Sequence, residues 1–330
     1  MSKLEYLEMS RDPRPREARR FREIFRRVHA RHPACLKDEW LMQPCRAGNG
    51  RVARRPIVWS RRNGAWRRVE ILWVGAAPGN AGARGAGELG AHGTRIPFGG
   101  DVGGGNMDVL LSTAGVSRNE TFITAALNTL PAGGGGEPRP AEIGRRVGGY
   151  PTSLHLLRDT LVAAGPRLVV ALGNVGLRAL IAAARLQAER KGARRGGKRT
   201  AALPSQRRLE QAGLRRNQPA PWPDAERPDD AFLAAWQKAW GDAPLPHLLW
   251  LTHPSAQNMS PYAGTHTAFH TRMRAAQAAL RAAVRTALGR EPPRARPPFP
   301  RAGIYALPEW RDRIRPRHEG LDRLWREKGV

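Results

Sequence analysis

Three loops of this chain combine residue types that could carry out chemistry on a bound ligand. The first is GAAPGN (75–80), whose small residues let the backbone approach a ligand closely while Pro78 fixes the turn. It is not a Walker phosphate loop, because no Gly-Lys-Ser/Thr sequence follows it. Taken alone, the motif fits a tight turn after a strand as well as it fits a binding site.

The second loop, GTRIPFGGDVGGGNM (93–107), places one aromatic ring and one carboxylate among many glycines. Phe98 lies between Pro97 and Gly99 in the sequence, where its ring can be exposed for stacking on a base. Asp101 precedes a predicted helix start and could cap that helix. The same carboxylate could instead polarise a water molecule or offset positive charge on a sugar.

The third loop, THPSAQNMSPYAGTH (252–266), carries a histidine near its start. His253 stands where a predicted strand ends, and a lone histidine at such a position is more often structural. Here it opens a run of hydrogen-bonding and bulky side chains: Ser255, Gln257, Asn258, Met259 and Tyr262. Such a loop could insert into a DNA duplex and hold a flipped base.

The elements that must position these loops alternate between apolar runs and helical patterns. Four short apolar runs are bounded by Gly, Pro or polar residues, as buried strands are: 69–75, 121–127, 167–173 and 247–253. Helical patterns separate or follow them at 107–115, 153–165, 174–186 and 265–288. The alternation predicts an α/β protein of three layers, α/β/α, with a central four-stranded parallel sheet. Ligands of such sheets bind beyond the carboxyl ends of the strands, which is where the first and third loops begin.

Composition divides the chain into a central domain and basic extensions. We expect residues 1–68 to form a basic N-terminal extension with a helix and a hairpin, whose turn is Asn63–Gly64. The α/β/α domain spans 69–289, with a polar, partly disordered insertion at about 187–230, and residues 290–330 form a Pro- and Arg-rich tail. The helix of the extension is predicted from apolar residues at helical spacing: Phe21, Ile24, Phe25 and Val28.

The chain is strongly basic, with 56 Lys and Arg against 28 Asp and Glu and a formal net charge of +28. A charge this large attracts polyanions, so nucleic acid is the first expected partner and an anionic membrane the alternative. No apolar run approaches the ~20 residues of a membrane-spanning helix. A secretory signal is not expected, since the N-terminus lacks an apolar core and carries Glu5 and Glu8. We therefore expect a cytoplasmic, nucleoid-associated protein.

The basic residues of the insertion have two interpretations. They could form a solvated surface loop, or they could contact DNA phosphates, which position a protein without specifying sequence. We favour phosphate contacts, because compositional bias does not explain a twofold excess of basic over acidic residues. The residues concerned are Arg194, Arg195, Lys198 and Arg199, followed by Arg207, Arg208, Arg215 and Arg216.

The three loops, in this order, resemble those of the uracil-DNA glycosylase superfamily, nearest to its family-four and family-five members, over roughly residues 69–288. GAAPG is similar to the family's water-activating loop, and RIPFGGDVGG (95–104) is similar to the loop that supplies a base-stacking aromatic. HPSAQN (253–258), followed by GTHTAFHTRM (264–273), looks particularly like family five. The resemblance implies the same α/β/α fold, base flipping, and hydrolysis of the N-glycosidic bond.

The resemblance also implies roles for individual residues. His253 would hydrogen-bond the base oxygen that gains negative charge as the bond breaks, and Phe98 would stack on the base. The residues implied to line the pocket are Gly75, Ala76, Ala77 and Ser255. The residues implied to enter the DNA are Gln257, Asn258, Met259 and Tyr262.

This chain departs from the family pattern at the water-activating loop. Many superfamily members carry Asp or Asn at the position of Ala77, and family four carries Glu at the position of Ala76. The likeness to family five then makes Asp101 the best remaining candidate to activate water, with Asn80 and Asn128 as secondary candidates. Asn128 follows the second predicted strand and could also read the edge of the base.

A second departure concerns metal. Families four and five usually hold a [4Fe–4S] cluster on four cysteines, whereas this chain has two, Cys35 and Cys45. We expect no iron–sulfur cluster, no other metal and no cofactor, and the basic segments could take over the scaffold or DNA-binding role. We favour surface or helix-capping histidines over two other metal sites: zinc on His29, His32, Cys35 and Cys45, or a site of His253, His266 and His270.

With this resemblance, the sequence predicts a DNA-repair glycosylase that flips uracil out of double- or single-stranded DNA and removes it by hydrolysis, leaving an abasic site. We expect the protein to be a monomer. We expect no lyase chemistry, because no lysine lies in the three loops to form a Schiff base. Specificity among uracil, hypoxanthine, xanthine and ethenocytosine stays open. The alternatives are a nucleic-acid-binding protein that retains the fold but has lost hydrolysis, and a basic RNA-binding accessory protein.

Overall fold

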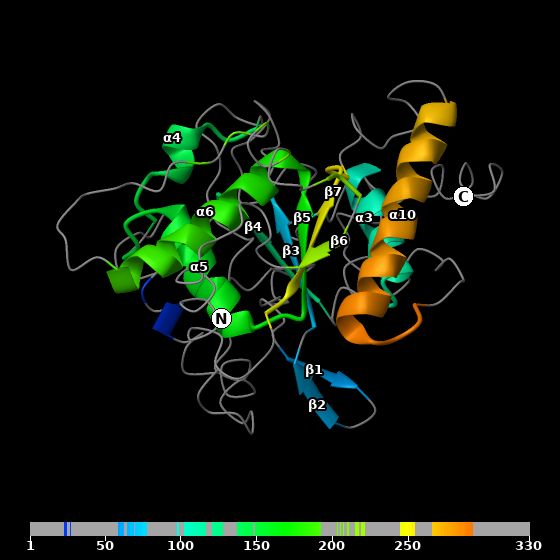
Figure 1. Cartoon of the computed structure of the whole chain (residues 1–330), viewed down its shortest axis with the longest axis horizontal. Helices are drawn as coiled ribbons and strands as arrows, with labels where there is room; N and C mark the ends of the chain where they lie inside the picture. The colour runs from blue at the N-terminus through cyan, green and yellow to red at the C-terminus, as the bar shows by residue number, and fades with distance from the viewer. Residues whose placement is uncertain are drawn as a thin grey trace, which may run out of the picture.

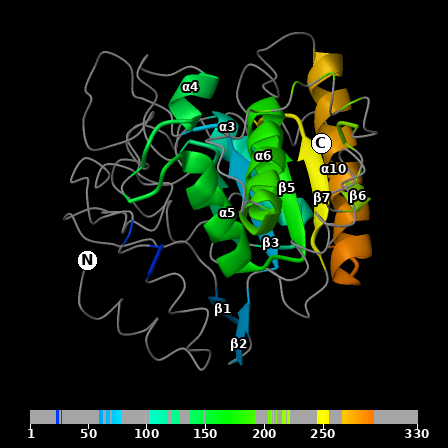
Figure 2. The same ribbon diagram turned by 60° about the vertical axis from the view of Figure 1, so that its left-hand side comes forward.

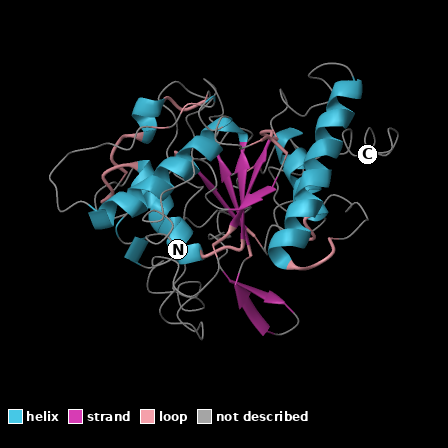
Figure 3. Cartoon of the chain, viewed as in Figure 1, coloured by secondary structure: helices cyan, strands magenta, loops and turns pink. Residues whose placement is uncertain are grey.

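The structure is a computed structural model, and the residues it describes are concentrated in the predicted α/β/α domain. They are Glu23, Ile24, Arg27, 59–62, 65–68, 70–77, Phe98, 102–116, 121–127, 137–147, 149–192, 203, 205, 207, 210, 215–217, 219–221, 245–254 and 266–292. Figure 1 shows these residues as a central sheet with helices on both of its faces, and Figure 3 shows the same layers coloured by secondary structure.

The central sheet contains the four predicted parallel strands. In spatial order they are β4 (Phe122–Ala125), β3 (Ile71–Gly75), β5 (Leu168–Leu172) and β7 (His247–Leu251), and neighbouring pairs are parallel. A fifth strand, β6 (Pro219–Pro221), pairs antiparallel with β7 at the edge of the sheet. The predicted four-stranded parallel core is therefore confirmed, and β6 is an addition that the apolar pattern did not indicate. Proline at both ends of β6 suits an edge strand, where a ladder donor can be missing.

Two helices cover each face of the sheet, and this makes the three layers. Helices α5 (Ser153–Ala164) and α6 (Gly173–Gly192) lie on one face, and α3 (Val102–Thr113) and α10 (His266–Leu288) on the other (Figures 1 and 2). A short helix, α4 (Pro140–Ile143), precedes α5. Helix α3 begins five residues before the predicted pattern at 107. Its first turn contains the buried Gly103 and Gly104, which are weak helix formers, so the local sequence did not indicate the earlier start.

Side chains of the parallel strands alternate between two apolar cores. On β3, Leu72 and Val74 join the core under α5 and α6, whereas Ile71 and Trp73 join the core under α3 and α10. All five residues of β3 are buried, as are those of β5. Strands buried on both faces are expected to be continuous apolar runs, which is why the sequence showed them clearly. The Trp73 indole also donates to Thr121 Oγ1 at 2.7 Å, which ties the start of β4 to β3.

The predicted hairpin is present and adjoins the start of β3. Strands β1 (Trp59–Arg62) and β2 (Ala65–Arg68) pair antiparallel, with Arg62 opposite Ala65, so the connection has two residues. Figure 1 shows the hairpin beyond the end of the sheet at which β3 begins. The hairpin therefore lies away from the carboxyl edge, where ligands of such sheets bind.

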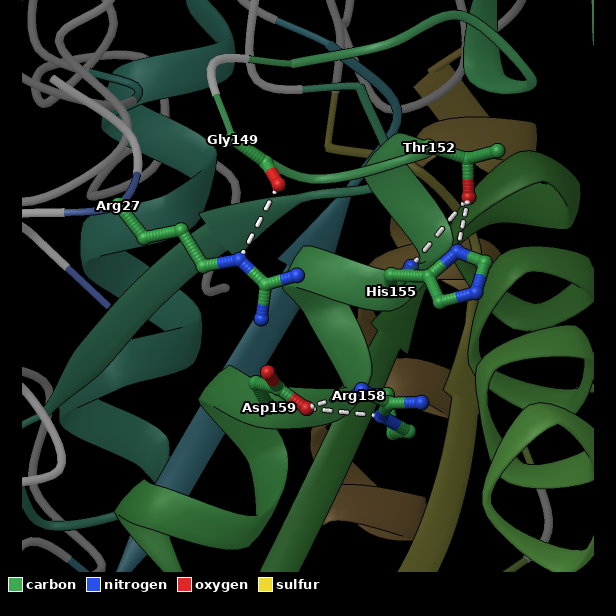
Figure 4. Close-up of polar contacts among 6 residues, drawn as sticks. All are labelled: Arg27, Gly149, Thr152, His155, Arg158 and Asp159. Carbon is green, nitrogen blue, oxygen red and sulfur yellow. Dashed lines mark hydrogen bonds and ion pairs between the residues drawn. The ribbon is translucent and has the colours of Figure 1, made fainter. Parts of the chain in front are cut away.

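The N-terminal segment is anchored to the loop that precedes α5. Glu23, Ile24 and Arg27 are helical, as the apolar spacing predicts, and Ile24 is buried in the core under α5 and α6. Arg27 Nε donates to the Gly149 carbonyl at 3.1 Å (Figure 4), and the Gly149 N–H donates to the Arg27 carbonyl at 2.7 Å. The Arg27 guanidinium carbon also lies 4.4 Å from the centre of the Tyr150 ring. These reciprocal contacts fix the segment through both its backbone and its side chain.

Polar side chains at the start of α5 lie close to this anchor (Figure 4). Thr152 is the N-cap, and its Oγ1 accepts from the His155 N–H at 3.4 Å and lies 2.8 Å from His155 Nδ1. The buried Arg158 pairs with Asp159, with Nη2 and Oδ1 2.6 Å apart. Burial lowers the pKa of His155 below its ordinary value of 6.5, and the charges of Arg158 and Arg27 lower it further against the opposing effect of Asp159.

Gly149→Ala tests the anchor of the N-terminal segment. An added Cβ would lie 2.7 Å from Arg27 Cγ and 2.8 Å from the Arg27 carbonyl oxygen, so the backbone contact would have to open. We expect the free energy of unfolding to fall by about 1–3 kcal/mol, measured by urea denaturation. Gly144→Ala is the control, because its Cβ would meet its nearest atoms at an ordinary 3.5 Å. Equal losses in the two variants would contradict the anchor.

His155 predicts how stability depends on pH. The unfolded chain has the ordinary pKa and the folded protein a lower one, so the unfolded chain binds more protons as the pH falls below about 6.5. The contribution of His155 to the free energy of unfolding is therefore complete above that pH. It is lost as the pH falls from there through the lower pKa of the folded protein. Burial lowers the pKa of His247 too, so both histidines act in the same direction. We expect His155→Gln to reduce the loss of unfolding free energy between pH 7.5 and 5.5; an unchanged loss would refute this assignment.

Candidate active site

The carboxyl edge of the sheet has the geometry of a doubly wound ligand site. From β3 the chain continues to α3 on one face, and from the neighbouring β5 it continues to α6 on the opposite face. Adjacent strands that lead to opposite faces leave a crevice at their carboxyl ends, and this is where ligands bind in such folds. Two of the predicted loops begin at this edge, one after β3 and the other after β7.

The structure brings together Phe98 and His253, the predicted stacking ring and the predicted hydrogen-bonding residue. Their ring centres lie 5.5 Å apart and the rings are tilted by 49°. Phe98 has a φ of +52°, an uncommon backbone conformation for a bulky residue. Its ring is partly buried against the core under α3 and α10. Residues far apart in the sequence thus form one pair at the edge of the sheet.

Gly173, at the start of α6, also lies close to His253. Its φ is +79°, and an added Cβ would lie 3.0 Å from His253 Cβ and 3.7 Å from Cγ and Cδ2 of the ring. Glycine is therefore needed both for the backbone conformation and for the close approach. In the sequence Gly173 was predicted only as the end of a strand, although a glycine between a strand and a helix was the available signal.

A second glycine in α6 brings the helix against β3. An added Cβ at Gly176 would lie 2.4 Å from the Val74 carbonyl oxygen and 3.5 Å from that of Gly75. Helix α6 thus packs directly on the strand from which the GAAPGN loop continues. The GNVG sequence at 173–176 therefore joins the ends of β3, β5 and β7 through two close contacts.

The backbone turn after β3 is fixed from the opposite side by β4. The Gly75 carbonyl accepts from the Ala126 N–H at 2.9 Å, and the Ala76 carbonyl accepts from the Leu127 N–H at 3.0 Å. In a trans peptide the N–H points opposite to the carbonyl, so the N–H groups of Ala76 and Ala77 point away from β4. Two successive donors with this orientation suit the predicted role of lining a pocket for an electron-rich base edge.

Asn106 links α3 to the third loop. It is fully buried, and its Nδ2 donates to the Pro254 carbonyl at 3.1 Å. The backbone just after His253 is therefore held by α3, the helix that begins within the second loop. Asn106 was not predicted as a site residue, since nothing in the glycine-rich motif around it indicates a partner 148 residues away.

Most other predicted site residues lie outside the described part of the chain, so their roles stay predictions. They are Asn80, Asp101, Asn128, Arg194, Arg195, Lys198, Arg199, Ser255, Gln257, Asn258, Met259 and Tyr262. The same holds for the alternative zinc ligands His29, His32, Cys35 and Cys45, and for the side chains of His266 and His270.

Among the described residues no three His, Cys, Asp or Glu side chains are grouped to hold a metal ion. None of the described helices is long and apolar enough to span a membrane.

Gly173→Ala tests whether the start of α6 positions His253. The strain of an alanine at positive φ costs roughly 1–2 kcal/mol wherever it occurs, and Gly289→Ala (φ +64°) is the control for it, since nothing lies within 4 Å of its added Cβ. We expect both variants to lose unfolding free energy, but only Gly173→Ala to shift the ring resonances of His253 in an NMR spectrum. Unshifted resonances in a folded Gly173→Ala protein would show that the contact does not position the ring.

Comparison with known proteins agrees with this geometry. The family model described as the uracil DNA glycosylase superfamily matches residues 64–280, which is well over half of the chain and includes β3, α3, β7 and the Phe98–His253 pair. A search of curated proteins gives no match. The arrangement of four parallel strands, flanking helices and loops at the carboxyl edge is that of an α/β glycosylase domain. The chain belongs to the uracil DNA glycosylase superfamily.

Proposed function

We propose that this protein removes uracil from DNA by hydrolysing the N-glycosidic bond, leaving an abasic site. Membership of the superfamily supports a glycosylase-type hydrolase with DNA as its substrate. The observation that carries the finer proposal is the Phe98–His253 pair, with ring centres 5.5 Å apart at the carboxyl edge. An aromatic face beside a hydrogen-bonding ring can hold a flat base by its face and by its edge at once.

Base flipping is the first requirement of this chemistry, because the bond to be broken is unreachable inside a duplex. The flipped base stacks on Phe98, and stacking on an aromatic side chain contributes about 1–3 kcal/mol per base. Since His253 lies beside that ring, it meets the edge of a base stacked there. The backbone N–H groups of Ala76 and Ala77, which point away from β4, provide further donors from the first loop.

Cleavage of the glycosidic bond transfers its electron pair to the leaving base, while the sugar becomes cation-like. His253 donates to the base oxygen that gains charge, and it does so from a fixed position. Gly173 contacts its ring on one side, and Asn106 holds the carbonyl of the next residue, Pro254. A donor that is already in place needs no reorganisation when charge develops, which is the main source of its effect.

Water then adds to the sugar carbon, and its proton passes to the departing base anion, which leaves as the neutral base. Ala76 and Ala77 offer no side-chain group for this step, so we propose Asp101 as the group that orients the water, with Asn80 and Asn128 as secondary candidates. The same two alanines motivate the second candidate function, a protein that binds DNA but has lost hydrolysis. The net charge of +28 supports DNA association, and hence a place at the nucleoid in the cytoplasm, under either proposal.

Single-turnover base release tests the proposed function. The substrates are labelled DNA containing one U:G, U:A or inosine:T pair, and single-stranded DNA with uracil, with alkali added afterwards to cut abasic sites. We expect release from uracil substrates, no strand cleavage before alkali, and a rate lower by about 10²–10³ in His253→Ala. His247→Ala is the control, because it changes the histidine that begins β7, whereas His253 follows the other end of that strand.

Two outcomes would overturn the proposal in different ways. If no substrate loses its base while salt-sensitive DNA binding is intact, the protein is a binding module that retains the glycosylase fold. If bases are released equally well by wild type and His253→Ala, the protein is a glycosylase whose chemistry lies elsewhere in the site.

A further inference from the structure

Arg216 is an exposed arginine whose side chain is held by two neutral partners. Its Nη2 donates to Asn174 Oδ1 at 3.1 Å, and its guanidinium carbon lies 5.0 Å from the centre of the Trp250 ring. Trp250 is itself 2% exposed and part of the core under α5 and α6, so it offers a rigid face. An arginine held in this way loses less conformational freedom when it binds a ligand than a solvated one does.

The backbone around Arg216 is fixed to the edge of the sheet. The next residue, Asn217, has a φ of +60°, and its N–H donates to the Trp250 carbonyl at 2.7 Å. Strand β6 then pairs antiparallel with β7, with Pro219 opposite Leu249. Because the two strands run in opposite directions, residues that precede β6 lie toward the carboxyl end of β7, where His253 follows. The register therefore brings Arg216 to the edge that carries the site.

One contact places the guanidinium beside the start of α6, and another places the imidazole of His253 there. Arg216 binds Asn174, and the preceding residue, Gly173, is the one that contacts His253. The guanidinium and the imidazole thus lie next to consecutive residues of the same helical turn. A group bound by Arg216 would be close to whatever His253 holds.

Within the part of the chain that the structure describes, no carboxylate is paired with Arg216. Four other described arginines are paired with acids: Arg158 with Asp159, Arg167 and Arg290 with Glu70, and Arg285 with Glu291. In the described part of the chain the partners of Arg216 are an amide oxygen and an indole ring, which leave its positive charge in place. A planar guanidinium that is fixed, exposed and uncompensated is suited to a phosphate, whose oxygens match its donor geometry.

We propose that Arg216 binds a backbone phosphate of the DNA strand next to the nucleotide held by His253 and Phe98. The proposal rests on the proposed function for the identity of the ligand, and it goes further by assigning one arginine to one phosphate at the site. Arg216 then positions the strand, while the other basic residues of the insertion contribute general attraction. Asn174 and Trp250 act as supports that aim the guanidinium.

The test measures binding, so that it does not depend on catalysis. Fluorescence anisotropy follows the binding of His253→Ala protein, with and without Arg216→Gln, to duplexes carrying one uracil. In a set of otherwise identical duplexes, one phosphate at a time near the uracil is replaced by an uncharged methylphosphonate. We expect one replacement to weaken binding about three- to tenfold when Arg216 is present and to have no effect in Arg216→Gln.

Arg215→Gln is the matched control, because it removes the same charge from the neighbouring residue, whose Nη1 donates to the Glu210 carbonyl. It should leave the effect of that methylphosphonate intact, and Asn174→Ala should reduce the effect without abolishing it. If Arg216→Gln and Arg215→Gln weaken binding alike and no single phosphate depends on Arg216, the residue contributes only general charge and the proposal is wrong. If the protein releases no base but the effect of that one methylphosphonate still depends on Arg216, the proposed function is wrong and the phosphate site is supported.

Discussion

The first turn of α6 has to fit against two neighbours at once, and the carboxyl edge of the sheet is arranged around that constraint. Gly176 lies against the Val74 carbonyl, and Gly173 lies against His253. A side chain at 176 would push α6 away from β3, and a side chain at 173 would push the imidazole away from α6. The parallel ladders set the relative positions of β3, β5 and β7, and the two glycines let α6 and His253 fit closely against the ends of these strands. The pairing of His253 with Phe98 depends in turn on that arrangement.

The parallel core could be predicted from the sequence because strands that are buried on both faces are continuous apolar runs, which are easy to recognise. Strands β3 and β5 are short apolar runs without alternation, and the helices between them have apolar residues at helical spacing. The elements that were not predicted lack such a sequence pattern. Strand β6 is three residues with proline at both ends, and α3 starts in a run of glycines, so backbone pairing and packing override local propensity at both places.

The sequence predicted the site residues that belong to a recognisable motif. It did not predict those whose role depends on a contact with a residue far away in the chain. Phe98 and His253 stood out by residue type and place, and the structure brings their rings together. Gly173 and Asn106 act through partners that are remote in the sequence, and each looks ordinary in its own segment. Arg216 was predicted as one of several phosphate-contacting residues of the insertion, but nothing in its own segment distinguishes it from the other arginines there. Their importance appears only when the strands are in register, which is information that a single chain read locally does not contain.

The anchor between Arg27 and Gly149 joins residues 122 positions apart, and this separation orders events during synthesis. The segment around Arg27 is made before its docking partners, the loop at 147–150 and the start of α5. At about 5–20 residues per second the segment waits for several seconds or more without its partners. Strand β3 has the same delay, because its neighbours β4 and β5 also follow it in the chain. The segment around Arg27 is thus made before both of the elements against which it docks.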